Sequence, residues 1–379
     1  MRLIRRYLGR AILGSVLFVL AGFLALFAFF DLIGELDDVG QGGYRLQHAL
    51  VFVLLGLPGR IYELMPVAAL IGAIYALAQF AASSEFTAMR AAGLGRRGAL
   101  GVVGAVGLGI ALLTALVGEV LAPQAERLAQ RMRLSAQTGA AVAGAELRSG
   151  IWVKDSVRDA AGALQRQRFV NIAEIRPDTS LRALRVFEFD ADFRLVLLLE
   201  AGGASFAPPH GWLLREAVLT RFEPVAVAGE VTALRARREP LAEMAWQSDL
   251  TPDLLGLLAV VPERMSAVAL FQYVRHLRDN QQRSDRYEIA LWKKFVYPLA
   301  VVVMMALALP FAYLQARAGG IGLKVFAGIM LGVAFHFLNG LFSHLGLLNT
   351  WPPWLAAVIP SGFALALALG MLAWVDRSR

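Results

Sequence analysis

Six charged or polar side chains lie inside or beside long apolar segments, where such groups are costly and usually serve a purpose. A cation and a carboxylate three residues apart on a helix can pair or relay charge, and adjacent lysines can bind a phosphate. Imidazole and amide groups inside an apolar helix can bind a ligand or a neighbouring helix. The residues are Arg60 with Glu63, Lys293 with Lys294, and His336 with Asn339.

Each pair has more than one reading. For Arg60 and Glu63 an interfacial ion pair is favoured over a transport relay. For His336 and Asn339 hydrogen bonds between helices are favoured over ligand contacts. The two lysines fit two partners equally well, either anionic headgroups or the phosphates of a substrate that enters from the outer leaflet.

Motifs for catalysis are missing from the chain. There is no GxxxxGK[ST] phosphate loop and no G-x-S-x-G turn, and the five histidines are never spaced as metal ligands. The sequence has no cysteine, which excludes disulfides and thiolate metal sites. We therefore expect no catalytic residue, no metal and no cofactor in this chain.

Residues 83–93 form a short polar connection with helix signals. Ser83 or Ser84 can cap a helix, Glu85 stands in its first turn, and Gly93 can end it. One interpretation is an amphipathic connector on the membrane surface. The other is a helix that docks in a groove of a second protein, with Glu85 as the charged anchor.

Long apolar runs identify the chain as a membrane protein. It is 58% hydrophobic, and residues 11–30 contain no charge. Twenty residues of helix cover about 30 Å, which is the thickness of the hydrocarbon layer. We expect six spans near 11–31, 58–81, 99–121, 296–315, 324–343 and 354–375, with 49–57 either interfacial or part of a strongly tilted helix.

The basic residues predict the orientation. The formal net charge is +8, and its clustering at span ends fits the positive-inside rule rather than nucleic-acid binding. Both termini are therefore expected in the cytoplasm, with an uncleaved signal anchor at the start. The cytoplasmic set comprises Arg2, Arg5, Arg6, Arg10, Arg90, Arg96, Arg97, Arg317, Lys324, Arg377 and Arg379.

The middle of the chain alternates apolar and polar residues with the period of β-strands. Strands are expected at 151–153, 168–172, 184–189, 193–200, 212–216, 218–222 and 231–234, with turns between them. This pattern predicts an antiparallel sandwich or jellyroll. Residues 125–146 are expected to extend the third span and then form a linker, and Ser266 is expected to cap a returning helix. The predicted units are the first three spans in 1–122, an outer β domain in 123–290 and the last three spans in 291–379.

Three phenylalanines on the first span, Phe23, Phe27 and Phe30, are spaced to share one helix face. The stripe could meet lipid, pack on another helix or line a cavity, and the first two readings together are favoured.

Several short motifs along the chain resemble those of one family, the lipopolysaccharide export permeases of Gram-negative bacteria. Their order and spacing, rather than any single motif, carry the resemblance, and they are closer to the LptG branch than to the LptF branch. The motifs include the segment 40–44, Glu85 with Met89 and Gly93, Gly118 with Glu119, the segment 122–124, Trp152 with Lys154 and Asp155, Tyr273, Leu277, Tyr287, Trp292, Lys294 and Pro298.

The resemblance implies six spans in the inner membrane, a periplasmic β-jellyroll and a homologous partner subunit, LptF. It also implies two copies of a cytoplasmic ATPase, LptB, which would bind the ATP and Mg²⁺, and the bridge proteins LptC and LptA. Lipopolysaccharide would enter a cavity between the two permease subunits. The implied docking residues for the ATPase are Glu85, Met89, Arg90 and Gly93, and the candidate lipid cavity comprises Phe27, Phe30, Asp31, His336 and Asn339.

One departure from the family bears on the substrate. Relatives carry lysines on and after the first span that face phosphates, and the aligned positions here are Asp31, Asp37 and Asp38. Carboxylates repel phosphate unless a divalent cation joins them. Arg60, Lys293 and Lys294 then become the alternative candidate phosphate contacts. A membrane scaffold paired with an ATPase and an enzyme that modifies envelope lipids are the other classes considered. The apolar stripe on the first span and the jellyroll argue against the scaffold, and the missing catalytic motifs argue against the enzyme.

Overall fold

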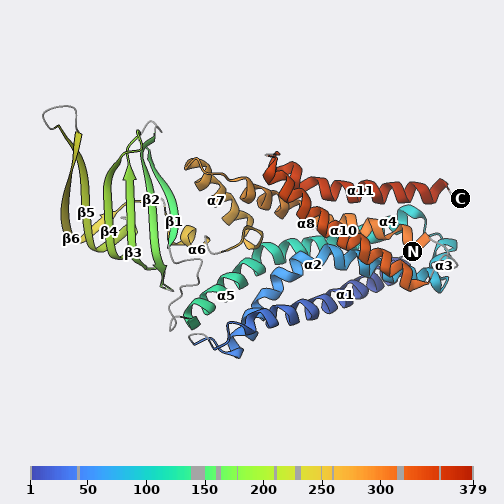
Figure 1. Ribbon diagram of the computed structural model, residues 1–379. Coiled ribbons are helices and arrows are strands. Elements are labelled where there is room, and N and C mark those ends of the chain that lie inside the picture. The colour runs from blue at the N-terminus through green and yellow to red at the C-terminus, as the bar shows by residue number, and fades with distance from the viewer. Residues whose placement is uncertain are drawn as a thin grey trace.

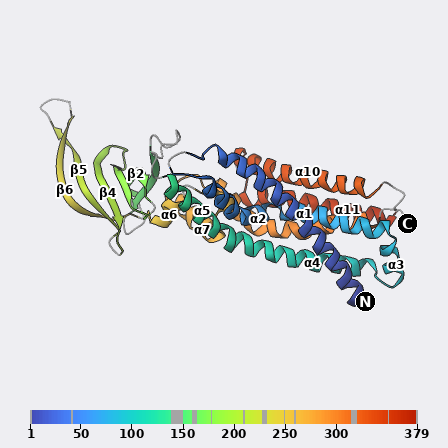
Figure 2. The ribbon, with the colours of Figure 1, turned by 90° about the horizontal axis from the view of Figure 1, so that it is seen from below.

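The computed structural model describes residues 2–40, 43–137, 150–158, 164–176, 178–208, 211–226, 232–248, 250–257, 260–313, 320–349 and 351–377. A bundle of long helices and a curved β sheet lie end to end (Figure 1). Both ends of the described chain and the short helix α3 (Glu85–Ala91) lie at the end of the bundle that is far from the sheet (Figures 1 and 2).

Six helical segments in the described part of the chain are long and apolar enough to cross a membrane, which confirms the expected number. The third passes from α4 through a short π-helix, η1, into α5, and the fourth includes α9. The bounds are α1 Arg2–Leu36, α2 Leu46–Ala82, α4 Arg96–Leu116, η1 Val117–Leu121, α5 Ala122–Gln137, α8 Asp285–Ala308, α9 Pro310–Tyr313, α10 Ile321–Leu348 and α11 Pro353–Arg377.

Helix α2 is the centre of the bundle and contacts α1, α5, α8 and α10. It is continuous from Leu46 to Ala82, with Pro58 and Pro66 inside it. Residues 49–57 therefore belong to one long helix, as the tilted-helix alternative requires, and are not a separate interfacial segment. Its 37 residues span about 55 Å, so the helix extends beyond the hydrocarbon layer.

Small residues let α1 cross α2 at close range. Ala68, Ala69 and Ala73 are fully buried around Gly72. A Cβ added at Gly72 would lie 2.5 Å from Cα and 2.6 Å from the backbone nitrogen of Val16 on α1. Because lipid tails are as apolar as leucine side chains, such backbone contact is a main source of helix association in membranes.

The third span changes from α-helix to π-helix at η1, between α4 and α5. A Cβ at Gly118, inside η1, would overlap the ring of Tyr62 on α2, so the ring packs directly on the glycine. π-Bulges of this kind often occur at functional sites. The helix then continues to Gln137, which confirms the expected extension of the span, while the expected linker up to residue 146 lies outside the described residues.

The segment that leads from the sheet back to the bundle forms a hydrogen-bonded contact with η1. Helix α7 (Ala267–Asp279) begins after Ser266, whose hydroxyl accepts a hydrogen bond from the Ala269 backbone at 3.1 Å, which confirms the expected cap. Both carboxylate oxygens of Glu119 lie 2.9 Å from the Ala267 backbone nitrogen, which donates to them. A carboxylate at a helix N-terminus also benefits from the helix dipole. The third span and α7 are therefore joined through η1.

The central domain is one six-stranded antiparallel sheet whose neighbours follow chain order. This confirms an inserted β domain, although the described strands form a single rolled sheet and not two stacked ones. The expected strands 212–216 and 218–222 are one strand. The strand expected at 231–234 corresponds to the start of β6, which runs from Thr232 to Trp246, and residue 231 lies outside the described residues. The strands are β1 Ile151–Arg158, β2 Leu164–Ile175, β3 Leu181–Phe189, β4 Leu195–Phe206, β5 Trp212–Ala226 and β6 Thr232–Trp246.

At one level of the sheet, each of the strands β2 to β6 has one residue that is left out of the pairing with its neighbours. We call this line across five strands the crease. Inward-facing residues elsewhere alternate, but here the spacing is three, as from Leu181 to Leu184 on β3 and from Leu214 to Ala217 on β5. Pairing skips one residue in each strand, yet the register on either side of the crease is unchanged. The skipped residues are Ala173, Ala183, Gly202, Glu216 and Ala242, of which Ala183 and Glu216 have positive φ.

The concave side of the sheet is closed at one end by the segment that follows β6. Helix α6 (Pro252–Leu257) contributes Leu255 to the apolar cluster of the sheet, and Leu250 lies beside it. The buried Trp212 donates its Nε1 proton to the Leu250 carbonyl at 2.7 Å. The β domain therefore has a core of its own, separate from that of the bundle.

Candidate functional site

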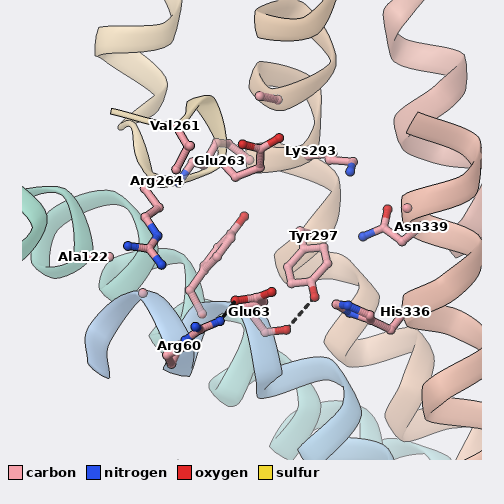
Figure 3. A pocket seen from close by; sticks show the side chains of 15 residues that line it. Arg60, Glu63, Ala122, Val261, Glu263, Arg264, Lys293, Tyr297, His336 and Asn339 are labelled. Carbon is pink, nitrogen blue, oxygen red and sulfur yellow. Dashed lines mark hydrogen bonds and ion pairs between the residues drawn. The ribbon is translucent and has the colours of Figure 1, made fainter. Parts of the chain in front are cut away.

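A cavity of about 330 Å³ lies at the end of the bundle nearest the sheet. Side chains from α2, α8, α10 and the turn η3 (Pro262–Arg264) face it (Figure 3). All six residues with which the sequence analysis began meet there, although they come from three different helices that are far apart in the sequence. They are Arg60, Glu63, Lys293, Lys294, His336 and Asn339.

The cavity has an excess of positive charge. Four cationic side chains line it, Arg60, Arg264, Lys293 and Lys294, against two carboxylates, Glu63 and Glu263. The sequence pattern did not single out the residues that complete the site, including Glu263 and Arg264. For another lining residue, Tyr297, the sequence did contain a signal. It follows Lys293 by one helical turn and therefore lies on the same face of α8.

Aromatic rings hold Lys294 and one wall of the cavity in place. The Lys294 ammonium lies 4.7 Å from the centroid of the Tyr62 ring and donates to the Gly118 carbonyl at 3.4 Å. The Tyr297 hydroxyl donates to the Glu63 carbonyl at 2.6 Å, which is the dashed contact in Figure 3. A cation over an aromatic face is stabilised by the ring quadrupole, most strongly where water is excluded.

Arg60 connects this cavity with a second one of about 520 Å³, which Phe30 and Asp31 line. Its guanidinium donates to both carboxylate oxygens of Asp31, at 3.0 and 2.6 Å, and to Glu63 at 3.2 Å. It also lies 5.3 Å from the Phe27 ring centroid. The expected Arg60–Glu63 pair is confirmed, but the two-pronged pair with Asp31 has the better geometry.

Acidic residues at and just beyond the end of α1 are also paired with an arginine. Arg133 on α5 pairs with Glu35 at 3.3 Å and with Asp38. Glu35 also accepts a hydrogen bond from Tyr44 at 2.8 Å. Burial, followed by this hydrogen bond, raises the pKa of Tyr44, so that its hydroxyl stays a donor at neutral pH. Asp31 and Asp38 therefore both lie in arginine–carboxylate pairs, which leaves less negative charge to repel a phosphate than the sequence suggested.

At the far end of the bundle, α3 exposes only part of the predicted docking set. Glu85 accepts hydrogen bonds from Tyr7 at 3.1 Å and from Ser83 at 3.0 Å. Arg90 is exposed over the Tyr313 ring at 5.6 Å. Met89 is only 8% exposed and packs in the core of the bundle.

Of the remaining α3 expectations, the glycine end is confirmed, but capping by Ser84 is not. Gly93 has a φ of +96°, a conformation that suits glycine after a helix end. Ser84 is the N-terminal flanking residue, but its side chain makes no capping bond.

Among the described residues there is no group of three His, Cys, Asp or Glu side chains that could hold a metal ion.

Comparison with known proteins agrees with this architecture. A family model described as "Lipopolysaccharide export system permease LptF/LptG" matches residues 6–374. A relative from Escherichia coli strain K12, named "Lipopolysaccharide export system permease protein LptG", is 31% identical over 371 residues and 97% of each chain. One of the same name from Haemophilus influenzae is 29% identical over 357 residues and 94% of each chain. The chain therefore belongs to the LptF/LptG family of lipopolysaccharide export permeases.

Proposed function

We propose that this chain is the LptG-type half of an ATP-driven exporter that takes lipopolysaccharide out of the inner membrane. It pairs with LptF, two LptB subunits bind and hydrolyse ATP with Mg²⁺, and LptC and LptA receive the lipid. The chain itself is not catalytic. Both termini and α3 face the cytoplasm, and the β sheet lies in the periplasm. The observation that carries the proposal is the cationic cavity beside the Phe30 pocket, at the end of the bundle next to the sheet.

The two cavities suit the two halves of an amphiphile. Arg60, Lys293 and Lys294 bind the phosphates, with Arg60 exchanging a carboxylate oxygen of Asp31 for a phosphate oxygen. Phe27 and Phe30 receive the acyl chains on the face of α1. Removing a CH₂ group from an apolar surrounding costs about 0.8 kcal/mol, so extraction needs a new apolar surface for each chain.

Energy enters through α3. Glu85 and Arg90 are the charged groups that dock on the ATPase, while Phe86, which is 2% exposed, and Met89 anchor the helix in the bundle. A helix fixed in this way transmits a push from the partner to α2, from which it is separated only by Ser83 and Ser84. Since α2 also carries Arg60, the push reaches the cavity through one continuous helix.

The sheet provides the next apolar surface. Its inward face carries leucine, valine and tryptophan side chains, and the second long connection between bundle and sheet runs through α7. We propose that the acyl chains pass along this inward face toward the bridge proteins. The Glu119 contact holds the start of α7, which follows the sheet domain, against the third span during that transfer.

Photo-crosslinking in reconstituted vesicles tests the proposal. A crosslinking residue is placed at Phe30, at Leu197 on the inward face of β4, and at Leu369, which is 59% exposed on α11, as the lipid-facing control. Lipopolysaccharide adducts at Phe30 without ATP, and at Leu197 only with ATP, are expected. Equal labelling at the three positions would mean ordinary bilayer contact and would refute extraction.

A second set of variants tests the phosphate contacts. Replacing Lys293 and Lys294 with glutamine should lower the adduct yield at Phe30, and Lys154→Gln in the sheet should leave it unchanged. An equal loss in both variants would show that charge in general, and not the cavity, attracts the lipid.

A further inference from the structure

A second basic cavity, of about 630 Å³, lies between α1 and α4 at the end of the bundle that carries the termini. Four arginines line it: Arg5, Arg6 and Arg10 on α1, and Arg97 on α4. No carboxylate lines it, and none of the four arginines forms an ion pair within the part of the chain that the structure describes. The cavity is therefore an uncompensated positive site.

The same two helices give the cavity an apolar floor. Gly9 on α1 faces Val106 on α4, and a Cβ at Gly9 would lie 3.3 Å from the Val106 Cγ2 atom, so the helices meet there. Gly98 and Gly101 on α4 leave the floor open, and nothing lies within 4 Å of a Cβ added at Gly101. The arginines sit nearest the helix starts, and the floor extends from them toward the middle of the bundle.

The start of α4 adds to the attraction for an anion. The residue before it, Gly95, offers no side-chain cap, so the first backbone N–H groups of the helix are not satisfied by a cap. A helix N-terminus carries a partial positive charge that favours anions. The charged end therefore combines four guanidinium groups with a helix start, directly above an apolar channel between two membrane spans.

We propose that this groove binds one anionic glycerophospholipid. The phosphate lies among the arginines, and an acyl chain follows the glycine-lined floor. The occupant follows from charge complementarity, from the joint polar and apolar lining, and from a volume in the usual range of ligand sites. The site needs only that α1 and α4 cross the bilayer, so it is independent of the exported substrate and of the cavities near the sheet.

The test uses the full-length chain, with the subunits that co-purify with it, in nanodiscs of phosphatidylglycerol and phosphatidylcholine. Retained lipid is counted by native mass spectrometry after mild detergent release. Arg6→Gln and Arg97→Gln remove groove charges, and Arg2→Gln, on the same helix but outside the groove, is the control. Each groove arginine should contribute about fivefold to phosphatidylglycerol retention, and Arg2 should contribute nothing.

A filling variant separates a groove from general surface charge. Gly101→Leu should abolish retention, whereas Gly109→Leu, an equally open position on the same helix outside the groove, should not. Equal losses for Arg2→Gln and Arg97→Gln would overturn the proposal, as would full retention in Gly101→Leu. Release of a protein subunit by Gly101→Leu, with lipid retention unchanged, would show a subunit interface there and would also overturn it.

Discussion

The contact between Gly72 and the backbone of α1 makes Gly72→Ala a sharp test of how the first span is held. The new Cβ would lie 2.5 Å from Cα, 2.6 Å from the nitrogen of Val16 and 2.9 Å from the carbonyl carbon of Ser15. Contacts between such atoms are normally about 3.5–4.0 Å. Helix α1 must therefore move away by about 1 Å, and it loses contact along the whole crossing.

The cost can be bracketed from general values. Overpacking in a tight core costs about 1–3 kcal/mol, while alanine is a better helix former than glycine by about 1 kcal/mol. Because backbone atoms cannot rotate away, we expect a cost at the upper end and a net loss of about 2 kcal/mol. The melting temperature of the full-length protein in detergent, followed by circular dichroism, should fall by a few degrees. Gly22→Ala on α1, where nothing lies within 4 Å, is the control and should not lower it.

Second-site changes distinguish a backbone clash from a side-chain clash. Val16→Ala should not rescue Gly72→Ala, because the obstructing atoms belong to the backbone. Gly332→Ala on α10 meets only the Val67 side chain, at 2.7 Å from its Cγ1 atom, and Val67→Ala should rescue it. An unchanged melting temperature in Gly72→Ala, or rescue by Val16→Ala, would refute this account of the crossing.

Three other predictions concern the ends of the bundle. Glu85→Lys should leave the protein folded and inserted but prevent co-purification of the proposed ATPase partner, while Thr87→Lys on the exposed face of α3 should not. A normal yield of the partner with Glu85→Lys would contradict the proposed docking role. Ser266→Ala should cost about 1 kcal/mol and speed hydrogen exchange in the first turn of α7, and unchanged exchange would show that the Glu119 contact alone is sufficient. The raised pKa of Tyr44 means that the folded protein binds the Tyr44 proton more tightly than the unfolded chain does, so stability should fall as the pH rises above about 10. The fall should be smaller in Tyr44→Phe, and equal pH profiles for the two proteins would contradict this prediction.

The sequence predicted the helical part of the fold well because charge-free runs of about twenty residues have few alternatives to a span. The prediction was less accurate where contacts between segments distant in the sequence determine the structure. Pro58 suggested the start of a helix, but neighbouring helices surround α2 and let it continue through the proline. β5 was divided in two because the crease interrupts its alternation at Glu216, and periodicity alone cannot tell an extra residue from a turn.

The sequence singled out several residues that line the cavity near the sheet, but it did not show that they lie together. Lys293 and His336 stand out because polar groups in apolar segments are rare, yet nothing local indicates that α8 and α10 bring them to one cavity. Met89 was predicted as a docking residue, but its spacing of three from Phe86 already indicated a shared face, and that face is buried. Arg133 was missed as the partner of Asp38 because the two lie on segments that meet only in the folded bundle.

The crease in the sheet limits how the β domain can change its length in evolution. Each of five strands carries the extra outward residue at the same level, so the strands stay aligned on both sides. Deleting Ala183 alone would shift half of β3 by one position against β2 and β4, which keep their extra residue, so that inward positions of β3 would lie opposite outward positions of its neighbours. Single-residue insertions and deletions should therefore be tolerated in the hairpin turns but not at this level, where only a coordinated change in all five strands preserves the core.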